Sequence, residues 1–315
     1  MKSCSTSTDY SNICMFAASG RVGSNFLLNS IRSDRSYFCM GEFFNSVDWN
    51  LSINSNIIQL MCHEKSEHIF EFADWLTKLH KFLRKNLKNI SSPNFCDVRM
   101  EMREFNGTPT IKLYDSIVDF LNNKLHKNTV HKIFFSNTTI FEKHSYRDLR
   151  NNFIDIEELL KKCNSLIIPY RKNALLTYIS DKKSYENNIY YIDSRGVNSE
   201  KIKESQDFKI SWDKKEYLHT FDYLNNSNKT IFEIYKNFIG NKCIVNFEEL
   251  HKQEDKVFYL QNTLQQNNIN VNINPEIFNP TVRQSKDQSY ENNFTNREEF
   301  LKDLADIPVF LEYEY

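Results

Sequence analysis

The chain has little glycine or proline, no surplus of charge and no long apolar run. Its 315 residues include 6 glycines, 6 prolines and 14% aromatic residues, a composition that argues against a disordered or collagen-like chain. Lys and Arg number 40 and Asp and Glu 41, so the formal net charge is -1. This balance argues against general nucleic-acid binding, although it is compatible with a local basic pocket.

Segments that would place the chain in or across a membrane are also missing. No apolar stretch reaches the length of about 18–20 residues that spans a bilayer. The first residues, MKSCSTSTDYSN, are polar and lack the apolar core of a signal peptide. We therefore expect a cytoplasmic chain with no membrane partner and no nucleic-acid partner.

Cysteine and histidine patterns that would bind a metal are absent as well. The 7 cysteines are odd in number and scattered, with no C-x-x-C pair, which predicts buried free thiols. His63 and His68 are five residues apart, so they do not form an H-E-x-x-H zinc helix. The sequence predicts no metal site.

Residues 13–31, which read ICMFAASGRVGSNFLLNSI, are the most informative stretch. An apolar run over 13–18 predicts a strand, and the apolar spacing over 27–31 predicts an amphipathic helix. A short loop with two glycines and Arg21 lies between them. Such a loop presents backbone N–H groups and a positive helix end to an anion. The stretch therefore predicts a phosphate-binding site.

Strands and helices alternate along the chain, which predicts an α/β fold with a mostly parallel central sheet flanked by helices. We expect further strands at residues 36–40, 110–114, 132–141, 165–169 and 243–247. We expect helices at residues 64–87, 116–125, 155–163, 174–184, 227–238, 252–266 and 297–305. The expected N-cap residues of the third, fourth and fifth of these helices are Asp155, Asn173 and Ser227. Residues 187–226 are irregular in pattern and are expected to form a lid or substrate-side insertion in a single domain over 1–315.

Two short segments near the N-terminus resemble one enzyme family. From Ser19 the loop reads SGRVGS, and from Gly41 the chain reads GEFFN. Both are similar to elements of the sulfotransferases that use 3′-phosphoadenosine 5′-phosphosulfate (PAPS), in which S-G-R-x-G-S is the 5′-phosphosulfate loop. The chain looks closest to the bacterial branch of carbohydrate and small-metabolite enzymes. The resemblance implies a P-loop-like sulfotransferase fold, with adenosine 3′,5′-bisphosphate (PAP) as product and no metal.

A second basic turn between a strand and a helix lies at Arg171 and Lys172. The family's 3′-phosphate motif has a serine eight residues after its arginine. In this chain Ser180 is eight residues after Lys172, not Arg171, so either residue can contact the 3′-phosphate. Arginine would do so as a planar fork of donors and lysine as a point charge. Ser180 also lies two helical turns after Asn173, on the same face.

Two later segments extend the resemblance towards the C-terminus. Residues 245–250, VNFEEL, resemble the family's V/I-x-Y-E-D-L strand end, and residues 281–284, TVRQ, resemble a basic loop that closes on the cofactor. The resemblance thus assigns to the cofactor Arg21, Val22, Gly23, Ser24, Asn25, Arg171, Lys172, Ser180 and Arg283.

In-line sulfuryl transfer requires a general base and neutralisation of charge at the 5′-phosphate. Arg21 is the candidate for neutralising this charge. Glu42 lies where some family members place a catalytic carboxylate, and His144 resembles the histidine of a K-H element in others. Histidine has an ordinary pKa near 6.5, whereas the pKa of Glu42 would need to be raised by burial. Both residues stay candidates for the base.

Another class shares the strand–loop–helix arrangement, namely the P-loop kinases and NTPases. Their motif is G-x-x-x-x-G-K-[ST], whereas here only two residues separate the glycines and no lysine precedes Ser24. A non-catalytic binding module is disfavoured by the acid and base candidates near both turns.

The acceptor is not specified by any motif. Neutral charge and many aromatic residues favour a small molecule with a hydroxyl or amine, such as a secondary metabolite or alkaloid, with a carbohydrate as the alternative. Lys112, on the strand expected at 110–114, is a weaker candidate for contacting the sulfonate. The acceptor pocket is expected to include Trp75, Tyr190, Tyr191, Trp212 and Tyr223.

Overall fold

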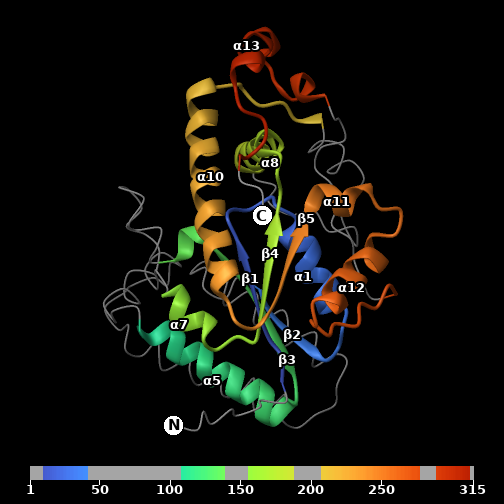
Figure 1. Ribbon diagram of the computed structural model, residues 1–315. Helices are drawn as coiled ribbons and strands as arrows, with labels where there is room; N and C mark the ends of the chain where they lie inside the picture. Colours follow the sequence, from blue (N-terminus) through green and yellow to red (C-terminus); the bar gives the residue numbers. More distant parts are fainter. Residues whose placement is uncertain (1–9, 42–107, 139–154, 188–206, 277–288, 313–315) are drawn as a thin grey trace, which may run out of the picture. The chain divides into compact units, whose positions relative to one another are not determined.

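The computed structural model describes residues 10–41, 108–138, 155–187, 207–276 and 289–312 (Figure 1). The strands are β1 (Asn12–Ala17), β2 (Tyr37–Gly41), β3 (Asn128–Phe134), β4 (Ser165–Tyr170) and β5 (Asn241–Asn246). The helices are α1 (Ser24–Arg32), α5 (Thr108–Leu125), α7 (Ile156–Leu160), α8 (Ala174–Glu186), α10 (Lys214–Asn237), α11 (Phe247–Lys252), α12 (Lys256–Gln266) and α13 (Arg297–Asp303). Short 3-10 helices are η1 (Phe135–Asn137), η2 (Tyr290–Asn293) and η3 (Leu304–Asp306).

The described strands form a five-stranded parallel sheet in the order β2-β3-β1-β4-β5, flanked by helices. Every residue of β1 and of β4 is buried. Strands of parallel sheets are continuously apolar and buried because helices cover both faces. The predicted α/β class with a parallel sheet is therefore confirmed.

The strand order reverses beside β1, which lies between β3 and β4. In open α/β sheets, ligands bind outside the carboxyl ends of the strands at such a reversal. Because β1 and β4 are neighbours and parallel, the basic turns that follow them emerge at the same sheet edge. The topology thus brings together two turns that the sequence shows far apart.

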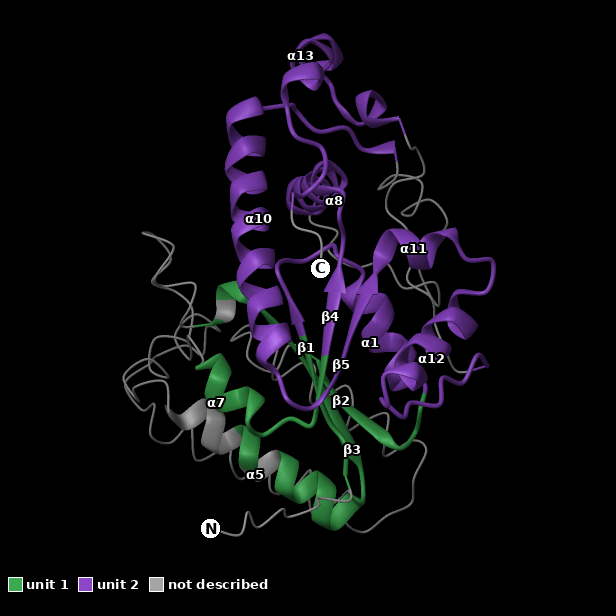
Figure 2. Cartoon of the chain, in the orientation of Figure 1, with its two compact units in different colours: residues 1–15, 34–166 green, residues 16–33, 167–315 purple. Residues whose placement is uncertain are grey.

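The chain forms two compact units, each made of separate stretches of sequence (Figure 2). Unit 1 contains residues 1–15 and 34–166, and unit 2 contains residues 16–33 and 167–315. Both basic turns belong to unit 2. The single domain expected over residues 1–315 stays a prediction.

Unit 1 contains β2, β3, α5 and α7, with β2 and β3 paired in parallel. Its core includes Tyr114, whose hydroxyl lies 3.2 Å from His131 Nδ1 and 3.9 Å from Cys163 Sγ. Burial lowers the pKa of His131 to about 3, so the imidazole is neutral. The prediction of buried free thiols is confirmed for the described cysteines, which are Cys14, Cys39, Cys163 and Cys243.

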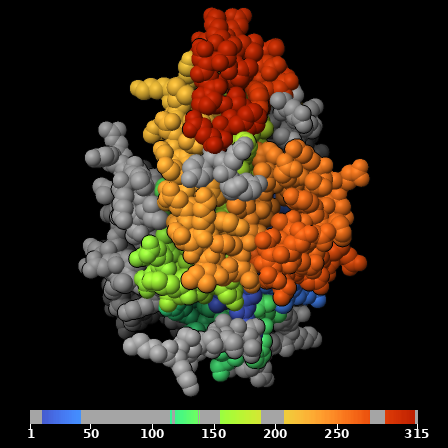
Figure 3. Space-filling model, in the orientation of Figure 1, coloured from blue at the N-terminus to red at the C-terminus, as the bar shows by residue number. Residues whose placement is uncertain are grey.

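Unit 2 contains α1, α8 and α10–α13. In Figure 1, α10 runs along one side of the strands of this unit, while α11 and α12 lie on the other side. The orange atoms of α11 and α12 lie at the surface in Figure 3. This position agrees with the burial of α11, whose only buried residue is Leu250.

The strand predicted at residues 110–114 is wrong, because these residues lie within α5. Lys112 is therefore a helical residue. Pro109 is tolerated in the first turn, where its missing N–H has no intrahelical partner to lose. Buried side chains then recur at helical spacing, at Tyr114, Val118, Leu121 and Leu125.

The irregular insertion predicted over residues 187–226 is wrong from residue 214 onward, where α10 begins. Asp213 caps this helix by accepting a hydrogen bond from the Glu216 N–H at 3.0 Å. Ser227, predicted as the cap, lies inside the helix and donates to the Tyr223 carbonyl at 2.7 Å. Residues 188–206 of the predicted insertion lie outside the described residues.

Other element boundaries differ by a few residues. The strand predicted at 132–141 is β3, which ends at Phe134 and is followed by η1. The helix predicted at 252–266 is α12, which begins at Lys256. Its N-cap residue is Asp255, whose carboxylate accepts a hydrogen bond from the Phe258 N–H at 2.8 Å. The expected cap at Asp155 is confirmed by its hydrogen bond from the Glu158 N–H. The helix predicted at 64–87 lies outside the described residues.

Candidate functional site: two basic turns at one sheet edge

The loop between β1 and α1 passes through two left-handed residues. β1 ends at Ala17, and α1 begins at Ser24 with Gly23 as its N-cap residue. Gly23 has φ 82°, which costs glycine little, whereas Arg21 has φ 63°, which side chains with a Cβ rarely adopt. One of the two left-handed positions of this loop is thus occupied by an arginine rather than a glycine.

Two side chains hold the carbonyl groups of this loop. Arg171 donates from Nη1 to the Arg21 carbonyl oxygen at 3.1 Å. The hydroxyl of Tyr223, on α10, donates to the Ala18 carbonyl oxygen at 3.0 Å. An unusual backbone conformation persists when its surroundings restrain it, as the bond from Arg171 does here. Tyr223, expected in the acceptor pocket, thus contacts the loop after β1.

Gly23 is also required because no side chain would fit there. A Cβ atom on Gly23 would lie 2.1 Å from Cδ2 of Phe247, the first residue of α11. A Cβ atom on Gly20 would approach Asp181 Oδ1 no closer than 3.9 Å, an ordinary contact. Gly23 is therefore demanded by both its φ angle and its packing, and Gly20 by neither.

The N-terminus of α1 keeps backbone donors available. No side chain caps this nine-residue helix, and its first turn has no acidic residue. Within the described ranges, no acceptor pairs with the N–H of Gly23 or of Ser24. Val22 and Ser24 are themselves buried. Unpaired N–H groups at the positive end of a helix in such surroundings favour an anion.

The turn between β4 and α8, residues 171–173, is built differently, because its backbone donors are already paired. Glu248, in the first turn of α11, accepts a hydrogen bond from the Lys172 N–H at 3.1 Å. Its second carboxylate oxygen accepts from the Asn173 N–H at 3.0 Å. One protein carboxylate thus occupies the first two backbone donors after Arg171.

The next donors of α8 are satisfied as well. Asn173 is its N-cap residue, as predicted, and its Oδ1 accepts from the Leu176 N–H at 2.8 Å. The Ala174 N–H donates to the Val309 carbonyl oxygen at 3.0 Å. An anion at this turn must therefore be bound by side chains rather than by backbone amides.

Arg171 is enclosed by protein groups. Its side chain is 9% exposed, and its Nε lies 3.9 Å from Glu248 Oε1. Its guanidinium carbon lies 5.6 Å from the centre of the Phe247 ring, in cation–π geometry. Together with the bond to the Arg21 carbonyl, these contacts direct Arg171 to the protein and make it the link between the two turns.

Lys172 and Ser180 are both partly exposed. The residue after Ser180 is Asp181, whose carboxylate lies beside Gly20 in the first loop. Desolvation raises the pKa of Asp181, and the positive charge of Arg21 opposes this shift. Asp181 is nevertheless exposed to solvent. The middle of α8, where Ser180 lies, is thus close to the loop after β1.

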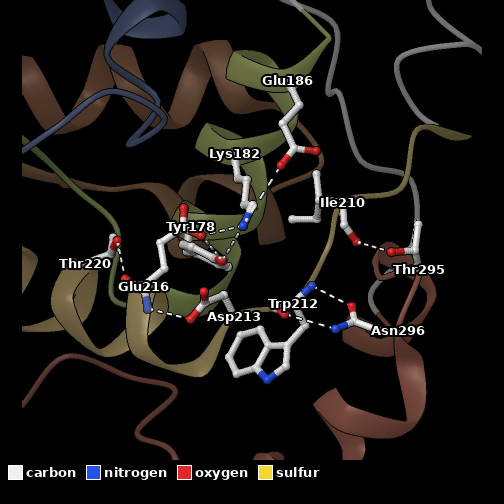
Figure 4. A network of polar contacts seen from close by, with 10 residues as sticks. All are labelled: Tyr178, Lys182, Glu186, Ile210, Trp212, Asp213, Glu216, Thr220, Thr295 and Asn296. Carbon is white, nitrogen blue, oxygen red and sulfur yellow. Dashed lines mark hydrogen bonds and ion pairs between the residues drawn. The ribbon is translucent and has the colours of Figure 1, made fainter.

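Helix α8 is held by polar contacts with the start of α10 (Figure 4). Lys182 donates to the Tyr178 hydroxyl at 3.2 Å and forms an ion pair with Glu216. Burial raises the pKa of Tyr178 to about 12. Desolvation lowers the pKa of Lys182, but hydrogen bonds with Glu216 and Tyr178 outweigh it and raise the pKa. Both groups stay protonated near neutral pH, so this network orients α8 and does not transfer protons.

The segment before α10 is tied to the C-terminal region (Figure 4). The Trp212 N–H donates to Asn296 Oδ1 at 2.6 Å, and Asn296 Nδ2 donates back to the Trp212 carbonyl at 3.0 Å. The Trp212 ring is buried against Tyr217, Phe294 and Phe300. Trp212, expected to line the acceptor pocket, lies in the core of unit 2, and its role in that pocket stays a prediction.

Several predicted site residues lie outside the described residues. They include both candidate bases, Glu42 and His144, and the C-terminal Arg283. Trp75, Tyr190 and Tyr191, expected in the acceptor pocket, also lie outside. The roles of these residues stay predictions.

Within the residues described, no group of three or more His, Cys, Asp or Glu side chains could hold a metal ion. None of the helices in that part of the chain combines the length and the apolar character needed to cross a bilayer.

Sequence reasoning missed the roles of Phe247, Glu248 and Asp181. Phe247 and Glu248 lie within the segment VNFEEL, which matched a family pattern, but no function was assigned to them. Their position directly after a strand of the same sheet was the available signal. Asp181 carried no signal, since an acidic residue on an amphipathic helix is ordinary.

Known proteins add no assignment to this geometry. The chain matches no protein-family model, no curated protein and no solved structure.

Proposed function

We propose that the protein is a sulfotransferase that moves a sulfuryl group from PAPS to a hydroxyl or amine of a small-molecule acceptor. One observation carries the proposal, namely the 3.1 Å hydrogen bond from Arg171 to the Arg21 carbonyl, which joins the two basic turns. PAPS carries its 3′-phosphate and its 5′-phosphosulfate on one ribose. A protein that binds both groups therefore needs two basic sites close together.

The loop after β1 is suited to the 5′-phosphosulfate. The N–H groups of Gly23 and Ser24 supply backbone donors at the start of α1. Arg21, from the same loop, and Asn25, from the first turn of α1, would add side-chain donors. Donors fixed before the reaction stabilise charge that develops on the bridging oxygen during transfer, without having to reorganise.

The turn after β4 is suited to the 3′-phosphate only through its side chains. Its backbone donors are paired with Glu248 and Val309. Arg171 is enclosed by protein groups, which leaves Lys172 and Ser180 as the partly exposed candidates. The spacing of eight residues between them also favours Lys172 over Arg171 as the phosphate ligand.

When bound, PAPS supplies the sulfuryl group and releases PAP. The protein's own groups would position the acceptor, remove its proton and neutralise the charge left on the 5′-phosphate. Arg21 performs the last task, and Glu42 or His144 removes the proton. Unchanged turnover in Glu42→Gln together with lost turnover in His144→Ala would show that Glu42 is not the base.

Calorimetry with PAP tests the proposed class directly. We expect PAP to bind in the micromolar range or tighter and ATP to bind weakly. Absence of PAP binding contradicts the proposal, whereas tight ATP binding with hydrolysis favours a P-loop kinase or NTPase. A panel of acceptors incubated with labelled PAPS would then separate small metabolites from carbohydrates, the alternative substrate class.

A further inference from the structure

Two adjacent residues at the junction of β5 and α11 contact both basic turns. The Phe247 ring packs on Gly23 of the first loop, so closely that it excludes a Cβ atom there. Glu248 bridges the backbone N–H groups of Lys172 and Asn173 in the second turn. All of these residues belong to unit 2.

Arg171 completes the connection between the turns. It donates to the Arg21 carbonyl in the first loop, while its guanidinium lies over Phe247 and close to Glu248. The contacts thus form a closed ring. Phe247 packs on the first loop, the adjacent Glu248 binds the second turn, and Arg171 of that turn donates back to the first loop. We call Phe247, Glu248 and Arg171 the brace.

We propose that Glu248 is a positioning residue that fixes the spacing between the two phosphate sites, and so sets the preference for a nucleoside 3′,5′-bisphosphate over a 5′-monophosphate. This inference rests on the proposed function. Glu248 touches no phosphate in this proposal. It acts through the backbone of the second turn and through Arg171.

The physical reason is that Glu248 accepts hydrogen bonds from two neighbouring backbone N–H groups, those of Lys172 and Asn173. A carboxylate accepts on both oxygens, and hydrogen bonds to a charged group are the stronger kind. Without them, the Lys172 and Asn173 N–H groups lose the carboxylate that accepts from both, and Arg171 loses one of its neighbouring charges. The second turn is then held less firmly, by its remaining hydrogen bonds to Val309, Leu311 and Tyr290. The first loop keeps Gly23 and the start of α1, so its own anion site is preserved.

The two sites should therefore respond differently when the brace is broken. Adenosine 5′-monophosphate (AMP) uses only the first site and should bind almost as before. PAP uses both sites, so it should lose the affinity that depends on their spacing. The measured quantity is the ratio of the PAP and AMP affinities, which a general loss of folded protein does not change.

The experiment compares Glu248→Gln with Glu249→Gln by calorimetry, using PAP and AMP as ligands. Glutamine keeps the shape of Glu248 but can accept at only one of its two terminal atoms. Glu249 is a matched control, because its carboxylate pairs with Lys252 at 2.9 Å and takes no part in the brace. We expect the affinity ratio to fall about tenfold in Glu248→Gln and to stay unchanged in Glu249→Gln.

Each outcome decides a different claim. An unchanged ratio in folded Glu248→Gln overturns the positioning role and leaves the sulfotransferase proposal standing. Failure of the wild-type protein to bind PAP overturns both. If Glu248→Gln does not fold, Phe247→Leu takes its place, since it removes the ring between Gly23 and Arg171. A ratio that Phe247→Leu leaves at the wild-type value then overturns the brace.

Discussion

The two turns between strand and helix at the edge of the sheet have similar positions in the fold but differ in whether their backbone N–H groups are paired. Both follow buried strands, both contain arginine and both lead into a helix. After β1, the N–H groups of Gly23 and Ser24 have no acceptor among the described residues. After β4, Glu248, Val309 and Asn173 satisfy the corresponding groups of α8.

The difference shows that a basic turn after a strand is not by itself a phosphate cradle. Whether the backbone N–H groups of such a turn stay unpaired depends on whether another element places an acceptor next to them. Among the described residues, α11 places the Glu248 carboxylate next to the second turn and not the first. The first turn is open to an anion through its backbone, and the second through its side chains. Five predictions test this contrast, from the largest expected effect to the smallest.

Arg21→Ala should cost the most activity, because it removes the cation of the open turn. We expect turnover in the labelled-PAPS assay to fall by about 10²–10³, the usual effect of losing one preorganised donor at a developing charge. Arg35→Ala is the matched control, since Arg35 is exposed and lies in unit 1. Near-normal turnover in Arg21→Ala would remove Arg21 from the mechanism.

Gly23→Ala should destabilise the protein by about 2–4 kcal/mol, because it combines a left-handed φ with a clash. Gly20→Ala should change stability by less than about 1 kcal/mol, since its added Cβ meets only an ordinary contact. Urea unfolding of both variants measures the difference. Equal stabilities would show that Phe247 does not press on Gly23 as described.

Arg171→Ala and Lys172→Ala should separate structure from binding in the closed turn. Arg171→Ala should lower stability by about 2 kcal/mol, because it removes the buried donor to the Arg21 carbonyl and the cation beside Glu248. Lys172→Ala should lower stability by less than about 0.5 kcal/mol but weaken PAP binding about tenfold. Unfolding curves measure the stabilities and calorimetry measures the PAP affinities. If Arg171→Ala weakens PAP binding and Lys172→Ala does not, Arg171 rather than Lys172 binds the 3′-phosphate.

Asn173→Ala should lower stability by about 1 kcal/mol through loss of the α8 cap. Asp155→Ala removes the cap of α7 in unit 1 and should have a similar effect on stability. Only Asn173→Ala should also weaken PAP binding, because it loosens the closed turn. Comparable PAP affinities in the two variants would mean that this turn does not contribute to binding.

Asp181→Asn should slightly raise stability at neutral pH, by at most about 2 °C in Tm. The pKa of Asp181 in the folded protein is raised above its ordinary value by desolvation. The charged form therefore costs stability as the pH rises through that pKa, and this cost is absent below about pH 3.9. Thermal unfolding at pH 4 and pH 7.5 checks the sign, which is refuted if the gain is larger at the lower pH.

Local features of the fold were readable because short-range physical chemistry produces them. The buried strands β1 and β4 are continuous apolar runs, and the caps at Asp155 and Asn173 are side chains with fixed spacing to the amides they accept from. The strand predicted at residues 110–114 was wrong because the spacing of apolar residues over a longer stretch decided the structure. Residues 110–114 look like a strand alone, yet their apolar positions continue in helical register to Leu125.

The sequence by itself determined that two basic turns follow buried strands of a parallel sheet, because burial pattern, glycine and capping residues act within a few positions. Only the tertiary structure decided which turn stays open. Glu248 reaches the second turn from 76 residues away, and Arg171 reaches the first loop across 150 residues. Such pairings depend on which strands become neighbours, and that is settled by the packing of the whole sheet.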